Sequence, residues 1–137
     1  MSGRTFHRDG QPPMAHQVFV FGSNLSGYHG GGAARAAHQQ YGAQWGVAEG
    51  MQGRSYALPT VQARIAGPLS LDEIREHVDT FIAFAHMKPD TEFFVTRVGC
   101  GLAGHSDEDI APMFIGAPSN CSLPDAWAQY ITEGEDL

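Results

Sequence analysis

Cysteine, positive charge and long apolar runs are all scarce in this chain of 137 residues. Its two cysteines, Cys100 and Cys121, are too few for a disulfide framework or a four-thiolate zinc site, so a reducing cytoplasm is the expected compartment. Lys and Arg total 8 against 15 Asp and Glu, and the formal charge of -7 disfavours binding to duplex nucleic acid or an anionic membrane surface. No stretch approaches the roughly 20 apolar residues of a membrane-spanning helix. These absences predict a soluble protein that acts away from membranes and DNA.

Motifs for metal and nucleotide-triphosphate chemistry are missing as well. No set of His, Cys, Asp and Glu has zinc-like spacing, and no Gly-Lys-Ser or Gly-Lys-Thr of a Walker motif occurs. We therefore expect neither a metal site nor a cofactor. Glycine, by contrast, is abundant: the chain has 17, where average usage of about 7% would give roughly ten. Such an excess indicates tight turns or close approach of the backbone to a ligand.

The length fits one domain with a single core. Residues 1–16 are polar, include Gly10-Gln11-Pro12-Pro13 and show no periodicity, which predicts a poorly ordered arm without chemistry. Residues 17–137 form the predicted domain.

Apolar, β-branched runs and helical periodicity alternate along that domain. The predicted strands are 17–21, 55–60, 92–98 and 120–123. The predicted helices are 33–41, 71–87, 106–114 and 125–130, and residues 42–53 form a glycine-rich loop of low regularity. For the second helix, Ser70 and Glu73 have the spacing of a capping box. This order predicts an α/β fold, a three-layer α/β/α sandwich around a mostly parallel sheet.

The first strand runs into a glycine loop, Gly22 to Gly32, that leads into a helix. Gly30, Gly31 and Gly32 leave backbone N–H groups exposed near a helix N-terminus, a setting that suits a phosphate or pyrophosphate. A plain surface turn is the alternative. Asn24 either hydrogen-bonds a ribose or base edge or ties the loop through its own backbone.

A second glycine loop, Gly99-Cys100-Gly101-Leu102-Ala103-Gly104, follows the third strand and matches G-x-G-x-x-G. Only about 33 residues follow it, too few for the further strand and helix units of a dehydrogenase, so we keep only the phosphate-binding interpretation. Ligands of open α/β sheets bind at the carboxyl ends of the strands. Both loops lie at such ends and are expected to converge.

Acid–base candidates are few. His29 in the first loop is a ligand contact, a general base or a loop histidine of no consequence, and Glu49 offers a carboxylate in the middle segment. Arg35 either supplies a charge to a phosphate or is a solvated helix residue. Cys100 near His105 suggests a thiol nucleophile, but a small apolar residue in a tight loop accounts for the Cys as well and is the favoured interpretation.

The order of these motifs resembles that of the macro domains, which are ADP-ribose-binding α/β modules, in a short and divergent form. The segments that carry the resemblance are Gly22-Ser23-Asn24-Leu25, Gly30-Gly31-Gly32-Ala33-Ala34-Arg35-Ala36-Ala37-His38, Ser55-Tyr56-Ala57-Leu58-Pro59-Thr60 and Gly99 to Gly104. The resemblance spans roughly residues 17–118. It implies that Asn24 contacts the distal ribose, that the two glycine loops wrap the diphosphate, and that Phe114 or a nearby aromatic lines the pocket.

The resulting prediction is a domain that binds ADP-ribose or a related nucleotide, with hydrolysis of an ADP-ribosyl or phosphoester bond left open. The expected ligand-binding residues are Gly22, Ser23, Asn24, Gly30, Gly31, Gly32, Arg35, Gly99, Gly101, Leu102, Ala103, Gly104 and Phe114, with His29 and Glu49 as catalytic candidates. Two alternatives stand beside it: a noncatalytic oligomeric nucleotide sensor or sink, and an interaction protein without a nucleotide ligand, whose glycines only pack.

Overall fold

The computed structural model describes residues 4–63 and 67–135 and has an α/β fold. The strands are β1 (Thr5–His7), β2 (Val18–Asn24), β3 (Gly50–Gln52), β4 (Ser55–Val61), β5 (Phe93–Val95) and β6 (Cys121–Pro124). The helices are α1 (Gly32–Gln40), α2 (Leu71–His86), α3 (Asp107–Ile110) and α4 (Ala128–Glu135), with short 3-10 turns η1 (Ala111–Phe114) and η2 (Asp125–Trp127). No helix in the described part of the chain is long and apolar enough to cross a bilayer.

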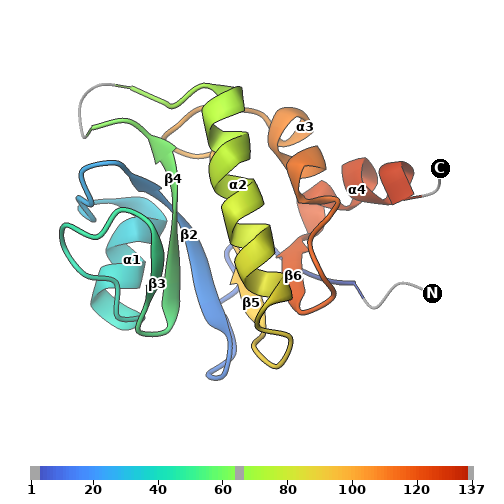
Figure 1. Ribbon diagram of the computed structural model, residues 1–137, viewed down its shortest axis with the longest axis horizontal. Helices are drawn as coiled ribbons and strands as arrows, with labels where there is room; N and C mark the ends of the chain where they lie inside the picture. The colour runs from blue at the N-terminus through green and yellow to red at the C-terminus, as the bar shows by residue number, and fades with distance from the viewer. Residues whose placement is uncertain (1–3, 64–66, 136–137) are drawn as a thin grey trace.

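The six strands form one mixed, mostly parallel sheet in the order β1-β6-β5-β2-β4-β3. Only β3 is antiparallel to its neighbour, β4 (Figure 1). Strands β5, β2 and β4 are adjacent and parallel. Their carboxyl ends therefore meet at one edge of the sheet, and the segments that follow them are brought together there.

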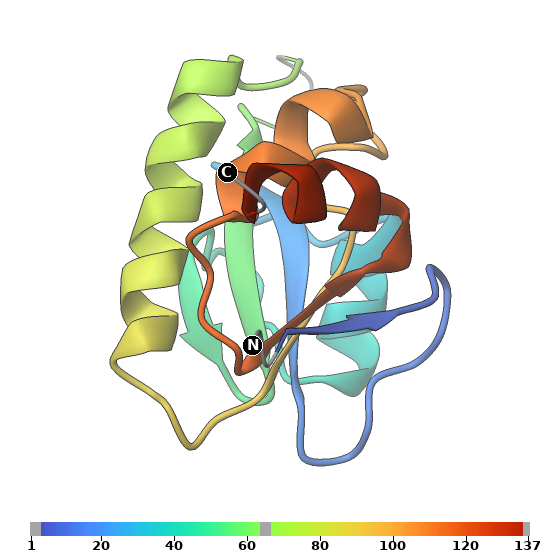
Figure 2. The same ribbon diagram turned by 90° about the vertical axis from the view of Figure 1, so that its right-hand side faces the viewer.

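Two clusters of buried side chains cover opposite faces of the sheet. Val18 and Val20 of β2 belong to the larger cluster with α2, η1 and α4, whereas Phe19 and Phe21 belong to the smaller one with α1. Alternate residues of a strand point to opposite faces, so α1 and α2 lie on different sides of the sheet. Figure 2 shows them there.

Helix α2 confirms the prediction from its sequence. It begins at Leu71, and Ser70 caps it: Ser70 Oγ accepts from Glu73 N at 3.2 Å, while Ser70 N donates to Glu73 Oε1 at 3.0 Å. Its apolar face buries Ile74, Val78 and Phe81 against the sheet. A reciprocal cap of this kind is encoded within four residues, which is why the sequence alone locates it.

The structure differs from the expectations in several places. Strand β2 continues through Asn24 into the expected glycine loop, the expected helix 106–114 is α3 followed by the 3-10 turn η1, and the expected helix 125–130 is the 3-10 turn η2 followed by α4. The arm expected to be poorly ordered contains β1, which pairs in parallel with β6 and is anchored by hydrogen bonds of 3.1 Å from Arg4 Nη2 to Ile115 O and Ala117 O. The irregular loop 42–53 contains β3, and strand 92–98 is shortened to Phe93–Val95. The chain turns beyond Thr96, where Val98 N donates to Thr96 O at 2.7 Å.

Candidate functional site

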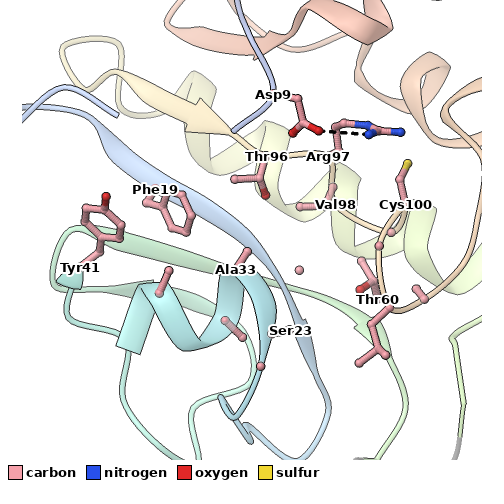
Figure 3. Close-up of a pocket in the computed structure, with 18 of the residues that line it drawn as sticks. Asp9, Phe19, Ser23, Ala33, Tyr41, Thr60, Thr96, Arg97, Val98 and Cys100 are labelled. Carbon is pink, nitrogen blue, oxygen red and sulfur yellow. Dashed lines mark hydrogen bonds and ion pairs between the residues drawn. The ribbon is translucent and has the colours of Figure 1, made fainter. Parts of the chain in front are cut away.

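A cavity of about 690 Å³ opens where the carboxyl ends of β2, β4 and β5 meet (Figure 3). It extends between α1 and the N-terminal residues 9–13, over the rings of Phe19 and Phe94. The expected site residues that line it are Gly22, Ser23, Asn24, Gly30, Gly31, Gly99, Gly101, Leu102 and Ala103. The two glycine loops, about seventy residues apart in the sequence, thus share one cavity, and their expected convergence is confirmed.

Both loops carry backbone N–H groups without acceptors. In the second loop, the amides of Gly99, Gly101, Leu102 and Ala103 donate to no acceptor within the described residues. In the first loop, the same holds for Gly31 and for Gly30. The first turn of α1 adds the orphan amides that begin every helix. Unpaired amides around one cavity are suited to an anionic group.

The side chain of Asn24 holds the first loop in shape. Asn24 Oδ1 accepts from Tyr28 N and Ser26 Oγ, both at 2.8 Å, and Asn24 Nδ2 donates to Tyr28 O at 2.8 Å. Of the two roles considered for Asn24, the structure has the loop-tying one. The residue still lines the cavity, but its amide is engaged by the backbone.

The second loop is held by a network around Asp107 at the start of α3. Arg97 donates two hydrogen bonds to the carboxylate, from Nε to Oδ1 at 3.0 Å and from Nη2 to Oδ2 at 2.7 Å. Trp127 Nε1 also donates to Oδ1, at 2.7 Å. Burial opposes ionisation of Asp107, but these hydrogen bonds outweigh it and lower the pKa of the carboxyl group. Arg97 Nη1 also pairs with Asp9 Oδ2 at 3.1 Å, which ties the N-terminal segment to the loop (Figure 3). These contacts among Arg97, Asp107, Trp127 and Asp9 hold the segments on either side of the second loop in place.

Cys100 lies in that loop as a free thiol. Burial, with the neighbouring carboxylate of Asp107, raises the pKa of Cys100 to about 12. The group is therefore a neutral thiol at physiological pH, whereas nucleophilic cysteines act as thiolates. Cys100 lines the cavity but lacks the lowered pKa of a nucleophilic cysteine.

Aromatic rings form the floor of the cavity. Phe19 stacks on Tyr41 with ring centroids 4.6 Å apart, and Phe94 stacks on His7 at 3.7 Å. His7 Nδ1 is hydrogen-bonded to Ser122 Oγ at 2.8 Å. Phe19 and Phe94 are themselves buried, so these rings give the cavity an apolar floor beside the polar loops.

His7 gives the fold a pH dependence. Burial lowers the pKa of His7 below its usual 6.5, so the unfolded chain takes up a proton before the folded chain does. The contribution of His7 to stability is complete at pH values above 6.5 and is lost as the pH falls from there toward the folded-state pKa. We expect the free energy of unfolding to fall less between about pH 7 and about pH 5 in His7→Gln than in the wild-type protein. Urea titrations at each pH measure the free energy of unfolding. An equal fall in that free energy for His7→Gln and the wild-type protein would contradict the prediction.

His29 lies outside the cavity. It is 1% exposed, its Nε2 is 2.7 Å from Gln44 O, and its ring packs edge-on against Phe21 at 5.5 Å. The side chain that local spacing placed in the ligand loop is thus packed beneath it. No proton transfer to a ligand in the cavity is available to it in this conformation.

Glu49 is also outside the cavity. Its Oε2 pairs with His77 Nδ1 of α2 at 2.8 Å, at the molecular surface. Neither candidate for acid–base chemistry therefore lines the cavity.

Four further expected residues do not line the cavity. Phe114 is fully buried in the core of the opposite face, with its ring 5.0 Å from that of Trp127. Arg35 is exposed on α1, Gly32 adopts a positive φ of 57° at the start of that helix, and Gly104 closes the second loop through a bond from its N to Gly101 O at 3.0 Å. Phe114 was placed by analogy, and its apolar ring goes to the core instead.

Several residues that line the cavity are not among those expected from the sequence. They are His7, Asp9, Phe19, Tyr41, Thr60, Phe94, Thr96 and Arg97. Thr60 and Thr96 lie toward the carboxyl ends of the predicted strands 55–60 and 92–98. Both carry a signal, since ligands of α/β sheets bind at the carboxyl ends of the strands. His7 and Asp9 carry none, because only the pairing of β1 with β6 brings them to the site. In the part of the chain that the structure describes, no three His, Cys, Asp or Glu side chains could hold a metal ion.

Comparison with known proteins places the fold but not the activity. No protein-family model matches the chain, and no curated protein matches it. Among solved structures, a protein of unknown function from Bacteroides thetaiotaomicron is similar, with a TM-score of 0.59 and 15% identity over 88% of this chain and 96% of that chain. At this identity the likeness concerns the fold alone, so the chain shares an α/β architecture with that protein.

Proposed function

We propose that this protein binds ADP-ribose or a related nucleotide, with the diphosphate held between the two glycine loops. One observation carries the proposal: acceptorless amides from two distant loops line the same cavity. Its volume of about 690 Å³ lies within the range of roughly 300–1,000 Å³ found for small-molecule sites. The proposal includes a macro-like fold, with the sheet as the middle layer of a three-layer α/β/α sandwich.

The charge around the cavity supports recognition by amides. Among the described residues, Arg97 is the only Lys or Arg that lines the cavity, and its guanidinium is paired with Asp107 and Asp9. An anionic group in this acidic protein therefore depends on backbone N–H donors. The apolar floor beside these donors gives the mixed lining, mostly apolar with a few polar groups, that is typical of small-molecule sites.

Binding has more support than catalysis. The two acid–base candidates, His29 and Glu49, lie away from the cavity, and the thiol of Cys100 is neutral. Hydrolysis of an ADP-ribosyl or phosphoester bond enters only as an outcome of the test below. The two cysteines are free, as expected for a protein of the reducing cytoplasm, which is the compartment we propose.

Thermal denaturation with ADP-ribose, NAD, AMP and inorganic phosphate tests the proposal. At a ligand concentration of 100 times Kd, binding to the native state adds about 2.7 kcal/mol to the free energy of unfolding. We expect Tm to rise by several degrees with ADP-ribose, and mass spectrometry to recover the ligand unchanged. A new product mass would identify an enzyme. If no nucleotide moved Tm, the glycines would be packing residues and the proposal would be wrong.

A further inference from the structure

The side chain of Thr60 lies in the cavity wall, and its hydroxyl has no hydrogen-bond partner among the described residues. Thr60 is 3% exposed and lines the cavity. Its backbone O accepts from Leu69 N at 2.9 Å, but within residues 4–63 and 67–135 no group pairs with Oγ1. Oγ1 is not among the fully buried, unpaired polar atoms of the described residues, so the oxygen faces the cavity, where a ligand can reach it.

A β-bulge aims this side chain. In the pairing of β2 with β4, Ser23 lies opposite Pro59 and Asn24 opposite Val61, so Thr60 has no partner on β2. The extra residue of a bulge turns its side chain away from the regular alternation of the strand. In Figure 3, Thr60 lies between the end of β2 at Ser23 and the loop that carries Cys100. The bulge therefore places the hydroxyl between the two glycine loops.

Two glycines keep the space in front of Thr60 open. A Cβ atom on Gly22 would lie 3.1 Å from Thr60 Oγ1 and 3.7 Å from Gly99 N. A Cβ atom on Gly99 would lie 3.8 Å from Thr60 Cγ2, and Gly99 also has a positive φ of 79°. Side chains at either position would crowd the hydroxyl. The backbone N–H of Gly99 also has no acceptor among the described residues, so it too is available to a polar ligand at this point of the cavity.

We propose that Thr60 Oγ1 donates a hydrogen bond to a diphosphate oxygen of the bound ligand, beside the amide of Gly99. This inference rests on the proposed function and names the side chain that recognises the anion at that site. The hydroxyl has no protein partner that it must give up when a ligand enters. A ligand oxygen would supply a charged acceptor, and hydrogen bonds to charged groups are stronger than those between neutral groups.

Replacement of Thr60 by the isosteric valine separates a role of the hydroxyl in ligand binding from a role in stability. Hydrogen bonds to charged groups contribute enough that Thr60→Val should raise the Kd for ADP-ribose by between about tenfold and a hundredfold. The Tm of the free protein should be unchanged, because the hydroxyl pairs with no group among the described residues. Thr60→Ser, which retains the hydroxyl, should bind far better than Thr60→Val. Thr80→Val on the exposed surface of α2 is the matched control and should bind as wild type.

Calorimetric titrations with ADP-ribose and, in parallel, inorganic pyrophosphate give a decision in every case. If the wild-type protein binds ADP-ribose and Thr60→Val binds it equally well, the role of Thr60 is wrong and the proposed function stands. If only pyrophosphate binds, the nucleotide assignment fails and the pyrophosphate affinities of the variants test Thr60. A wild-type protein that binds neither overturns both inferences. A marked loss of Tm in ligand-free Thr60→Val would assign the hydroxyl to the fold instead.

Discussion

Valine in place of Gly31 or Gly101 should abolish ligand binding while leaving the protein folded. Neither residue has a positive φ, and a Cβ on either meets no atom within 4 Å, so both positions accept a side chain. Gly31 is the N-cap of α1, where loss of glycine costs at most about 1 kcal/mol. A branched side chain beside the unpaired amides, however, would keep the diphosphate away from them. We expect the Kd for ADP-ribose to rise at least about a hundredfold, which corresponds to about 2.7 kcal/mol.

Gly116→Val provides the matched control for this pair. Gly116 also lacks a positive φ and has open space around its Cβ position, but it does not line the cavity. Its affinity and Tm should equal those of the wild-type protein. If Gly31→Val bound normally while folded and Gly101→Val did not, the two loops would not share one ligand. If both unfolded the protein, the glycines would be needed for packing.

Phe114→Ala should have the opposite profile, with a large loss of stability and no change in affinity. Phe114 is fully buried and packs with Trp127 at 5.0 Å and Phe81 at 6.3 Å between ring centroids. Truncation of a buried Phe costs about 3–5 kcal/mol, a large part of the roughly 5–15 kcal/mol that stabilises a domain. Chemical denaturation measures the loss, and calorimetry at low temperature measures the affinity of the folded fraction.

Leu102→Ala is a useful contrast to Phe114→Ala. Leu102 is 91% exposed at the rim of the second loop, so its removal should change the free energy of unfolding by less than about 0.5 kcal/mol.

A stable Phe114→Ala protein that no longer binds ADP-ribose would place Phe114 in the ligand site and contradict its assignment to the core.

Local signals made part of this fold predictable. The capping box at Ser70 and Glu73 locates the start of α2, and the apolar run of β2 ends in a glycine loop as expected. The convergence of both loops also followed, because parallel strands share the edge at which they end. Such features depend on residues within one turn or one strand, or on a general rule of sheet topology.

Features that depend on distant pairing were not predictable in this way. Three residues of β1 carry no local strand pattern, and they are ordered by pairing with β6 more than a hundred residues later. The position of His29 in the sequence indicates a loop histidine. In the structure, however, its Nε2 is hydrogen-bonded to the backbone O of Gln44, fifteen residues later in the chain. The bulge at Thr60 was missed, although Pro59 within a strand is a recognised sign of one.

The central claim is that two glycine loops bind one ligand, and amide NMR spectra recorded with increasing ADP-ribose test it most directly. The account predicts that the N–H signals of Gly30, Gly31, Gly101, Leu102 and Ala103 shift together with a single Kd, because those amides lack acceptors in the free protein. Signals at Glu49 should stay in place, since it lies outside the cavity. Shifts confined to one loop, or none in either, would contradict the claim.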